Sequence, residues 1–358
     1  MPTIDEQIRE IEEEIRKTKY NKATEHHIGL LKAKLARLKE AKDSQRKGGG
    51  AQQGIKKTGN AMVSLVGFPS VGKSTLFNLL TNAKSEVGYY DFTTVNVIPG
   101  IMEYRGAKIQ ILDLPGLIEG ASRGKGRGKE VLSVVRNSDL IMIVTDVNSP
   151  DPEPLIEILH EAGIRLNKRR PRLFLVKKDR GGLNIQKTVN VDLSDEMIAS
   201  IMREFRIVNA DLIIRDRIDM DDLIDFLSGN RVYIPGIFVL NKMDQGIDDK
   251  TNEIVDKYSM LKISAIRGEG IESLKESIFD ALDFITIYLK PPDGDPEPMV
   301  IKRYSSIEMV CRSIHKDFVK NFKYAIVNGP SAKYPNQKVG LEHIVEDGDT
   351  VTIYLRRS

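Results

Sequence analysis

The stretch AMVSLVGFPSVGKSTLFNLL (61–80) runs from an apolar strand pattern through a glycine-rich loop into a helical segment. Its loop has glycines at 67 and 72, followed by Lys73 and Ser74, in the spacing GxxxxGKS. Glycines let the backbone wrap around an anion so that successive N–H groups point at phosphate oxygens. The helix that follows adds the positive end of its dipole. The motif in this strand–loop–helix context predicts a phosphate-binding loop.

The chemistry of a phosphate loop assigns roles to single side chains. Lys73 is expected to bridge the β- and γ-phosphates of a nucleotide, and the Ser74 hydroxyl is expected to coordinate Mg2+. The predicted contact residues of the loop are Gly67, Pro69, Ser70, Val71, Gly72, Lys73, Ser74 and Thr75.

A second motif, Asn241-Lys242-Met243-Asp244, follows the apolar strand pattern GIFVL (236–240). The Asp244 carboxylate can accept hydrogen bonds from N1–H and the exocyclic amine of guanine, and adenine offers neither donor. Lys242 is expected to lie along the base and Asn241 to tie this loop to the phosphate loop. The motif therefore predicts GTP and GDP as ligands. An ATPase of similar architecture is the alternative, and Asp244 argues against it.

The segment Asp113-Leu114-Pro115-Gly116 closes another strand pattern between these two motifs. Asp113 is expected to reach Mg2+ through water, as an acid at the end of a neighbouring strand does in such proteins. The Gly116 amide can bond the γ-phosphate and so respond to hydrolysis.

Two further loops complete the predicted site. Thr93 and Thr94 lie between the first helix and the next strand, where a threonine can bind Mg2+ by its hydroxyl and the γ-phosphate by its amide. Ser264-Ala265-Ile266 follows the last strand and can present a backbone N–H to guanine O6. The order of the five loops along the chain matches one nucleotide site.

Alternating strand and helix patterns predict an α/β fold with a mainly parallel sheet covered by helices on both faces. The expected strands are 62–67, 108–114, 140–147, 236–242 and 260–265. They belong to a nucleotide domain over 61–290, with a small α/β insert at about 165–235 that has two strands and at least two helices.

The two ends of the chain differ from this pattern. Residues 1–60 predict a helical hairpin and a linker, and Thr3 with Glu6 forms a capping-box pattern at the first helix. The run PPDGDPEP (291–298) cannot continue a helix and marks a boundary. Beyond it, 291–358 predicts a compact α+β module.

Composition limits the class of protein. The chain has 358 residues, a net charge of +3 and a single cysteine, Cys311, which excludes an internal disulfide framework. No apolar run approaches the ~18–20 residues that span a membrane, and the N-terminus has no apolar signal-peptide core. We expect a cytoplasmic monomer that does not bind membranes.

Basic residues are concentrated in three segments. From Arg16 to Asn60 there are thirteen Lys and Arg against three Asp and Glu, and a second basic run spans 165–180. The third is glycine-punctuated and contains Arg123, Lys125, Arg127 and Lys129. Each segment is either a solvated surface or a contact with RNA phosphates or, for the third segment, with an acidic partner.

Four stretches carry a resemblance to a known family: GFPSVGKSTLFN (67–78), YYDFTTVNVIPG (89–100), 111–140 beginning ILDLPGLIEG, and NKMD (241–244). Together they resemble the Obg-related, translation-factor-class GTPases, and within these the DRG (developmentally regulated GTP-binding protein) family. Residues 311–354 resemble that family's C-terminal TGS domain, a β-grasp, ubiquitin-like fold. The resemblance covers almost the whole chain and implies a P-loop GTPase domain.

The resemblance also implies roles by position. Thr94 becomes the Mg2+ ligand of the first switch, and Gly116 opens the second, so Lys73, Thr94 and Gly116 are the expected catalytic residues. Leu117 stands where many relatives have a glutamine that orients water, which predicts a slow GTPase. Some relatives bind K+ through a phosphate-loop asparagine, and Ser70 takes that position here, so K+ is a second candidate cation.

Two functions remain open. The first is a GTPase switch that docks on the ribosome, tRNA or other RNA. The second is a nucleotide-dependent scaffold whose TGS domain takes a protein partner and in which hydrolysis is incidental.

Overall fold

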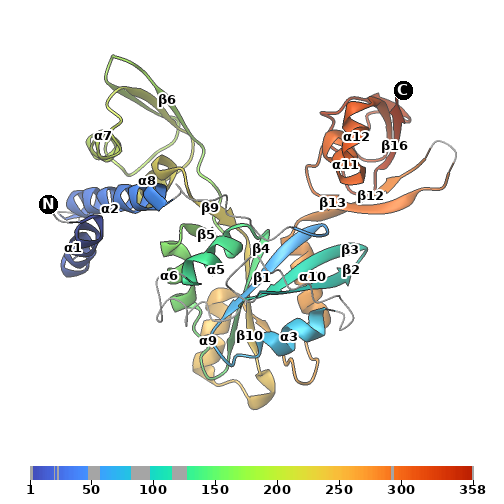
Figure 1. Cartoon of the computed structure of the whole chain (residues 1–358), viewed down its shortest axis with the longest axis horizontal. Coiled ribbons are helices and arrows are strands. Elements are labelled where there is room, and N and C mark those ends of the chain that lie inside the picture. Colours follow the sequence, from blue (N-terminus) through green and yellow to red (C-terminus); the bar gives the residue numbers. More distant parts are fainter. Residues whose placement is uncertain are drawn as a thin grey trace. The chain divides into compact units, whose positions relative to one another are not determined.

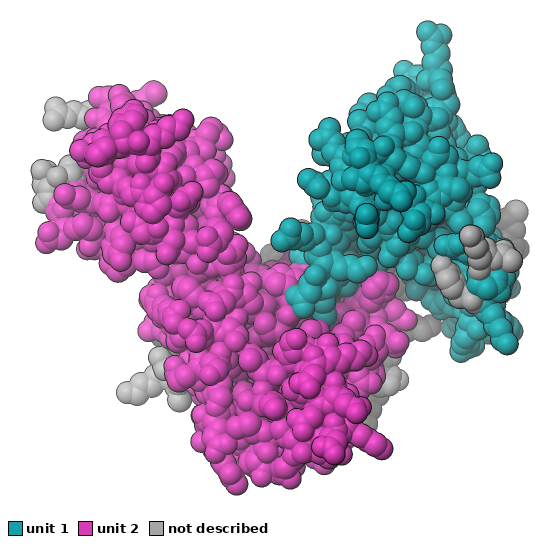
Figure 2. All heavy atoms as spheres, turned by 180° about the vertical axis from the view of Figure 1, so that it is seen from behind, with its two compact units in different colours: residues 1–53, 163–233 teal, residues 54–162, 234–358 magenta. Residues whose placement is uncertain are grey.

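The computed structural model describes residues 3–19, 21, 24–46, 57–81, 97–114, 127–291 and 294–356. The chain divides into two compact units, residues 1–53 with 163–233 and residues 54–162 with 234–358 (Figure 2). Each unit combines segments that are far apart in the sequence. The insert interrupts the nucleotide-domain pattern and belongs to the same unit as the N-terminal helices.

The larger unit contains a six-stranded sheet in the order β11-β10-β4-β1-β3-β2 (Figure 1). Neighbouring strands are parallel except β2, which runs antiparallel to β3. The strands are β1 (Ala61–Gly67), β2 (Ile98–Tyr104), β3 (Ala107–Asp113), β4 (Leu140–Asp146), β10 (Gly236–Asn241) and β11 (Leu261–Lys262). Strand β1 lies between β3 on one side and β4 on the other. The carboxyl ends of these strands therefore flank a topological switch point of the sheet.

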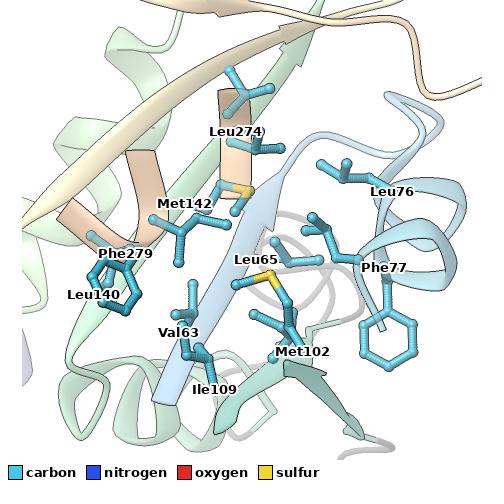
Figure 3. Packing of buried hydrophobic residues seen from close by; sticks show 14 of the residues in the cluster. Val63, Leu65, Leu76, Phe77, Met102, Ile109, Leu140, Met142, Leu274 and Phe279 are labelled. Atoms are coloured by element: carbon cyan, nitrogen blue, oxygen red, sulfur yellow. The ribbon is translucent and has the colours of Figure 1, made fainter. Parts of the chain in front are cut away.

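Helices cover both faces of this sheet (Figure 1). They are α3 (Lys73–Leu80) and α10 (Ile271–Ala281) on one face, and α5 (Arg127–Arg136), α6 (Glu153–Glu161) and α9 (Asp249–Tyr258) on the other. Alternate strand residues such as Val63, Leu65 and Met142 point towards α3 and α10, where they pack against Leu76 and Leu274 (Figure 3). The strands are apolar on both sides, as a sheet buried on both faces requires.

The same unit ends in a five-stranded sheet of order β13-β12-β16-β14-β15. The elements are β12 (Phe284–Leu289), β13 (Glu297–Lys302), α11 (Ile307–Ile314), α12 (Lys316–Lys320), β14 (Phe322–Asn328), β15 (Gln337–Val339) and β16 (Thr350–Leu355). Residues of α11, among them Ile307 and Cys311, pack on one face of this sheet against Ile287 and Val327. This mixed sheet with its helices forms the predicted β-grasp domain.

The smaller unit has its own core. Its elements are α1 (Ile4–Lys17), α2 (Glu25–Arg46), β5 (Ile164–Leu166), β6 (Leu173–Lys177), β7 (Leu183–Lys187), α7 (Asp195–Glu204), β8 (Ala210–Ile214), α8 (Met220–Ser228) and β9 (Val232–Ile234). Strands β6, β8 and β7 form one sheet, and β5 pairs with β9 at the two ends of the insert. Ala33 and Ala36 of α2 pack into the same core as Ile198, Leu212 and Leu223.

The N-terminal hairpin begins as its residues indicate. The Thr3 hydroxyl accepts from the Glu6 N–H at 3.3 Å, and the Glu6 carboxylate accepts from the Thr3 N–H at 2.7 Å. This is the predicted capping box. Ile8 and Ile11 of α1 are buried, as are Ile28 and Leu31 of α2, and the two helices pack together.

The structure departs from the sequence-based expectation at several elements. The expected strand 260–265 is reduced to Leu261–Lys262, because the chain turns at Ser264 to pair with Glu269. Strand β2 was not expected, and it is the antiparallel edge of the sheet. The insert has five strands where two were expected. The C-terminal sheet begins with β12, one strand before the proline-rich run where composition placed the boundary.

Among the described residues, no helix combines the length and the apolar character needed to cross a membrane.

Helix α3 offers a matched pair of leucines for testing the core. Leu76 is fully buried, whereas Leu79 on the same helix is 41% exposed. We expect Leu76→Ala to lower the free energy of unfolding by about 2–5 kcal/mol, because it removes buried methyl groups and leaves a cavity. Leu79→Ala should change it by about 0.5 kcal/mol or less. Urea denaturation of both variants measures the difference, and equal losses would contradict the packing of Leu76.

Candidate nucleotide-binding site

The phosphate loop leaves β1 at Gly67 and enters α3 at Lys73. Gly72 has φ +92°, a left-handed conformation that favours glycine. A Cβ atom at Gly72 would lie 2.4 Å from Asn241 Nδ2, and one at Gly67 would lie 2.4 Å from the Val144 carbonyl oxygen. Both positions therefore require glycine for close approach to a neighbour as well as for the shape of the turn.

Two polar side chains at the start of α3 lie within this loop. Lys73 is buried, and its Nζ donates to the carbonyl oxygens of Phe68 at 2.7 Å and Gly67 at 3.1 Å. The Ser74 hydroxyl donates to Asp113 Oδ2 at 2.9 Å. The structure thus brings together Ser74 and Asp113, which the sequence predicted as metal-binding partners from two separate motifs.

Asn241 connects three loops. Its Nδ2 atom donates to the Val71 carbonyl oxygen at 2.8 Å, and its Oδ1 atom accepts from the Ala265 N–H at 2.9 Å. The side chain is only 2% exposed, so both bonds are shielded from water. The phosphate loop, the 241–244 loop and the 264–266 loop are therefore held in one arrangement.

Lys242 crosses from the same loop to the phosphate loop. Its Nζ atom donates to the Ser70 carbonyl oxygen at 2.7 Å and to Asp146 Oδ2 at 2.5 Å. Asp146 is buried at the carboxyl end of β4, opposite Asn241 in the strand register. The sequence-based site did not include Asp146. The available signal was an acid at the end of the predicted strand 140–147, the same position that marked Asp113.

Asp244 is paired with the last predicted loop. Ser264 Oγ donates to Asp244 Oδ1 at 2.6 Å, and this hydrogen bond holds the pKa of the Asp244 carboxyl below its ordinary value. The carboxylate is thus ionised and can act as an acceptor throughout the neutral range. Ile266, the last residue of the 264–266 loop, is 77% exposed.

The remaining predicted residues fall into two groups. Pro69 in the loop and Thr75 in the first turn of α3 are exposed, and Leu114 is buried after β3. Thr93, Thr94, Pro115, Gly116 and Leu117 lie outside the described residues, as do Arg123, Lys125 and the side chains of Arg127 and Lys129.

Few of the described side chains in the candidate site can bind a metal ion. Among the described residues, no group of three or more His, Cys, Asp or Glu side chains could hold an ion. Ser74 and Asp113 offer two adjacent oxygen atoms, and oxygen donors are what Mg2+ prefers. This donor set fits a magnesium ion that takes its other ligands from a nucleotide and water.

Many basic residues of the hairpin have acidic partners within the smaller unit. Lys32 pairs with Asp221 and Arg37 with Glu204, across the contacts of α2 with the insert. Lys39 and Lys42 pair with Glu12 and Asp5 of α1. These charges contribute to the assembly of the unit, which favours the structural interpretation for this part of the first basic segment.

The second basic segment, 165–180, contains both ion-paired and exposed basic side chains. Arg165 is buried and forms a bidentate pair with Asp225, at 2.5 and 2.6 Å. Arg172 and Lys178 pair with neighbouring acids on β8 or just after it. The five other basic side chains of the segment are exposed, namely Lys168, Arg169, Arg170, Lys177 and Arg180, and of these Lys168 lies 3.6 Å from Asp222.

Comparison with known proteins identifies three consecutive family models along the chain. Residues 62–178 match a model described as 50S ribosome-binding GTPase, and residues 180–284 match the C-terminal region of the same domain. Residues 285–355 match the TGS domain, which begins at β12 as the sheet does.

Full-length relatives are found in archaea, plants and animals. An uncharacterized GTP-binding protein of Methanocaldococcus jannaschii is 50% identical, and the alignment covers 99% of this chain and 93% of the relative. Developmentally-regulated G-protein 3 of Arabidopsis thaliana is 48% identical, with 99% of both chains covered. Developmentally-regulated GTP-binding protein 1 of Xenopus laevis is 45% identical, with 97% of both covered.

Among solved structures, a GTP-binding protein from Pyrococcus horikoshii matches with a TM-score of 0.45 and 17% identity, covering 82% of this chain and 99% of that one.

The fold and the arrangement of the loops define a P-loop GTPase domain followed by a TGS domain. The chain belongs to the family of developmentally regulated GTP-binding proteins.

The Ser264–Asp244 hydrogen bond is expected to influence the ionisation of the Asp244 carboxyl, and this can be tested. A carboxyl whose pKa is lowered by folding stabilises the protein above its unfolded pKa of about 3.9, and this stability is lost as pH falls through the folded value. We expect Ser264→Ala to raise the pKa of Asp244, because the donor to the carboxylate is removed. Carbon NMR titration of the side-chain carboxyl measures the pKa.

Ser277→Ala is the matched control, because the Ser277 hydroxyl donates to a carbonyl within α10 and not to an acid. It should leave the Asp244 titration unchanged. An unaltered pKa in Ser264→Ala would contradict the assigned cause.

Proposed function

We propose that this chain binds GTP with Mg2+ and hydrolyses it to GDP and phosphate, and that its nucleotide state controls docking on RNA, with the ribosome as the first candidate. The observation that supports guanine best is the position of Asp244. Its carboxylate is oriented by Ser264, and its loop is tied to the phosphate loop through Asn241 and Lys242. A base read by Asp244 would thus be held at a set distance from phosphates bound at Gly72 and Lys73.

In the proposed hydrolysis of GTP, side chains of the chain bind the phosphates and the metal ion. Lys73 would leave its contacts with the Gly67 and Phe68 carbonyls and bind the β- and γ-phosphates, placing a positive charge where negative charge develops. Ser74 and Asp113 would hold a magnesium ion, which supplies further charge neutralisation when bound. Water attacks the γ-phosphorus atom, and the bond to the β–γ bridging oxygen breaks with release of GDP.

The remaining catalytic assignments follow from the family resemblance. We propose Thr94 as a further magnesium ligand and the Gly116 amide as a γ-phosphate contact. Leu117 has no polar atom to orient the attacking water, so we propose slow hydrolysis by the isolated chain. We propose K+ as a second cation near Ser70, where a serine takes the place of the asparagine that some relatives have.

RNA docking is proposed on two grounds. The model matched by residues 62–178 is described as a ribosome-binding GTPase, and the exposed arginines and lysines of 169–180 carry charge that phosphates would neutralise. We also propose that the hairpin with the insert, the rest of the nucleotide domain and the TGS domain act as distinct functional parts. The boundaries 1–60, 61–290 and 291–358 suggested by composition divide the shared core of hairpin and insert and separate β12 from its sheet. The scaffold function stays as the alternative, in which the TGS domain binds a protein and hydrolysis is incidental.

The guanine assignment is tested by Asp244→Asn. An amide at this position turns one acceptor into a donor, which suits xanthine, because xanthine has an oxygen at C2 where guanine has an amine. We expect weaker GTP binding, by about one hundredfold for the loss of a charge-assisted bidentate pair, and improved binding of xanthosine triphosphate. Calorimetric titration with both nucleotides measures this, and an unaltered base preference would remove the role of Asp244.

The docking proposal is tested by co-sedimentation with ribosomes in the presence of GDP, a non-hydrolysable GTP analogue or no nucleotide. We expect more bound protein with the GTP analogue and a steep loss of binding as salt rises, because phosphate contacts release counterions. Nucleotide-independent sedimentation, or none at all in low salt, would favour the scaffold function.

A further inference from the structure

Asp146 lies where the base-binding loop and the phosphate loop meet. It ends β4, the strand that lies between β1 and β10. Its register partner on β10 is Asn241, the residue before Lys242. None of the predicted site motifs contains Asp146, although the side chain is buried and ion-paired in the middle of the site.

The two carboxylate oxygens of Asp146 have separate partners. Oδ1 accepts from the backbone N–H groups of Asn148 and Ser149, each at 3.0 Å, and so closes the turn after β4. Oδ2 accepts from Lys242 Nζ at 2.5 Å. One oxygen therefore organises the turn, and the other fixes the end of a lysine that comes from a different strand.

The ion pair with Asp146 fixes the orientation of the Lys242 side chain. Its backbone is left-handed, with φ +62°, and its ammonium also donates to the Ser70 carbonyl of the phosphate loop. With both bonds made, the ammonium end of the side chain is fixed, so the aliphatic stem between it and the backbone has a set direction. A lysine without such a partner would lose this orientation to rotamer freedom.

We propose that Asp146 is a positioning residue for guanine nucleotides: it holds Lys242 so that the lysine stem forms a preorganised wall against the face of the base. This inference rests on the proposed function, in which the 241–244 loop binds guanine. Asp146 itself touches no nucleotide in this proposal and acts only through Lys242. A wall against the ring face adds affinity for any purine in the site, while the base edge is read by Asp244.

The substitution Asp146→Asn tests the pairing with Lys242 separately from the closing of the turn after β4. The amide oxygen can still accept from Asn148 and Ser149, whereas the amide NH2 faces the Lys242 ammonium donor to donor. We expect the affinity for GDP to fall about tenfold, through faster dissociation, because one hydrogen bond to a charged group is lost. The loss should be equal for GDP and for inosine diphosphate, which lacks the exocyclic amine, so the ratio of the two affinities stays constant.

Asp139→Asn is the matched control. Asp139 precedes the first residue of β4, at the opposite end of the strand, and also combines a backbone partner, the Met62 N–H, with a lysine partner, Lys302. The same substitution there should lower thermal stability and leave GDP affinity unchanged. Thermal unfolding of both variants shows whether any loss of affinity reflects loss of the fold.

Lys242→Met tests whether Asp146 acts through the lysine. Methionine keeps an apolar stem and removes the ammonium, so Asp146→Asn should cost no further affinity when added to it. The measurement is fluorescence titration and stopped-flow dissociation of labelled GDP from the full-length chain with Mg2+.

The outcomes are distinct. A tenfold loss in Asp146→Asn that disappears in the double variant supports the inference. Wild-type affinity in a folded Asp146→Asn protein would overturn it, as would an additive loss in the double variant or a changed ratio of GDP to inosine diphosphate. Absence of GDP binding by the unsubstituted chain would instead overturn the proposed function, and the inference with it.

Discussion

The side chain of Asn241 donates to the Val71 carbonyl and accepts from the Ala265 N–H, and it does so while almost fully buried. A buried amide that satisfies both of its functions within three loops leaves little freedom to any of them. The 241–244 loop and the phosphate loop are separated by about 170 residues of chain, yet this side chain, together with Lys242, holds them next to each other. Lys242 and Asp244, which follow Asn241 in the same loop, form their own pairs with Asp146 and Ser264.

Close packing at the ends of the strands makes this arrangement possible. The carboxyl ends of β1, β3, β4 and β10 lie at one edge of the sheet because the strands are parallel. Glycines at 67 and 72 allow the loop to approach Val144 and Asn241 more closely than any side chain would permit. The acids at the ends of β3 and β4 then find a partner in the neighbouring motif: Asp113 in Ser74, and Asp146 in Lys242.

The charges of the smaller unit show how composition alone can mislead. Residues 16–60 carry a large excess of basic residues, which suits a nucleic-acid surface as well as a solvated one. In the fold, Lys32 and Arg37 of α2 reach acids on or beside the helices of the insert, more than 160 residues away along the chain. The sequence pattern could not reveal these pairs, because it does not say that the hairpin and the insert share one core. Among the described residues, part of the basic charge of the hairpin is therefore paired within the smaller unit, whereas Arg169, Arg170, Lys177 and Arg180 are exposed.

The phosphate loop, the NKMD motif and the parallel α/β class can be predicted from the sequence, because each depends on local spacing: glycines at a turn, a lysine at a helix start, and apolar runs of strand length. The sequence also determined the hairpin cap, which involves neighbours three residues apart. The tertiary structure alone decided that Asp146 belongs to the site, that β12 opens the C-terminal sheet and that α2 packs on the insert. These features depend on contacts between distant segments, and such contacts arise only when the whole chain buries its apolar faces together.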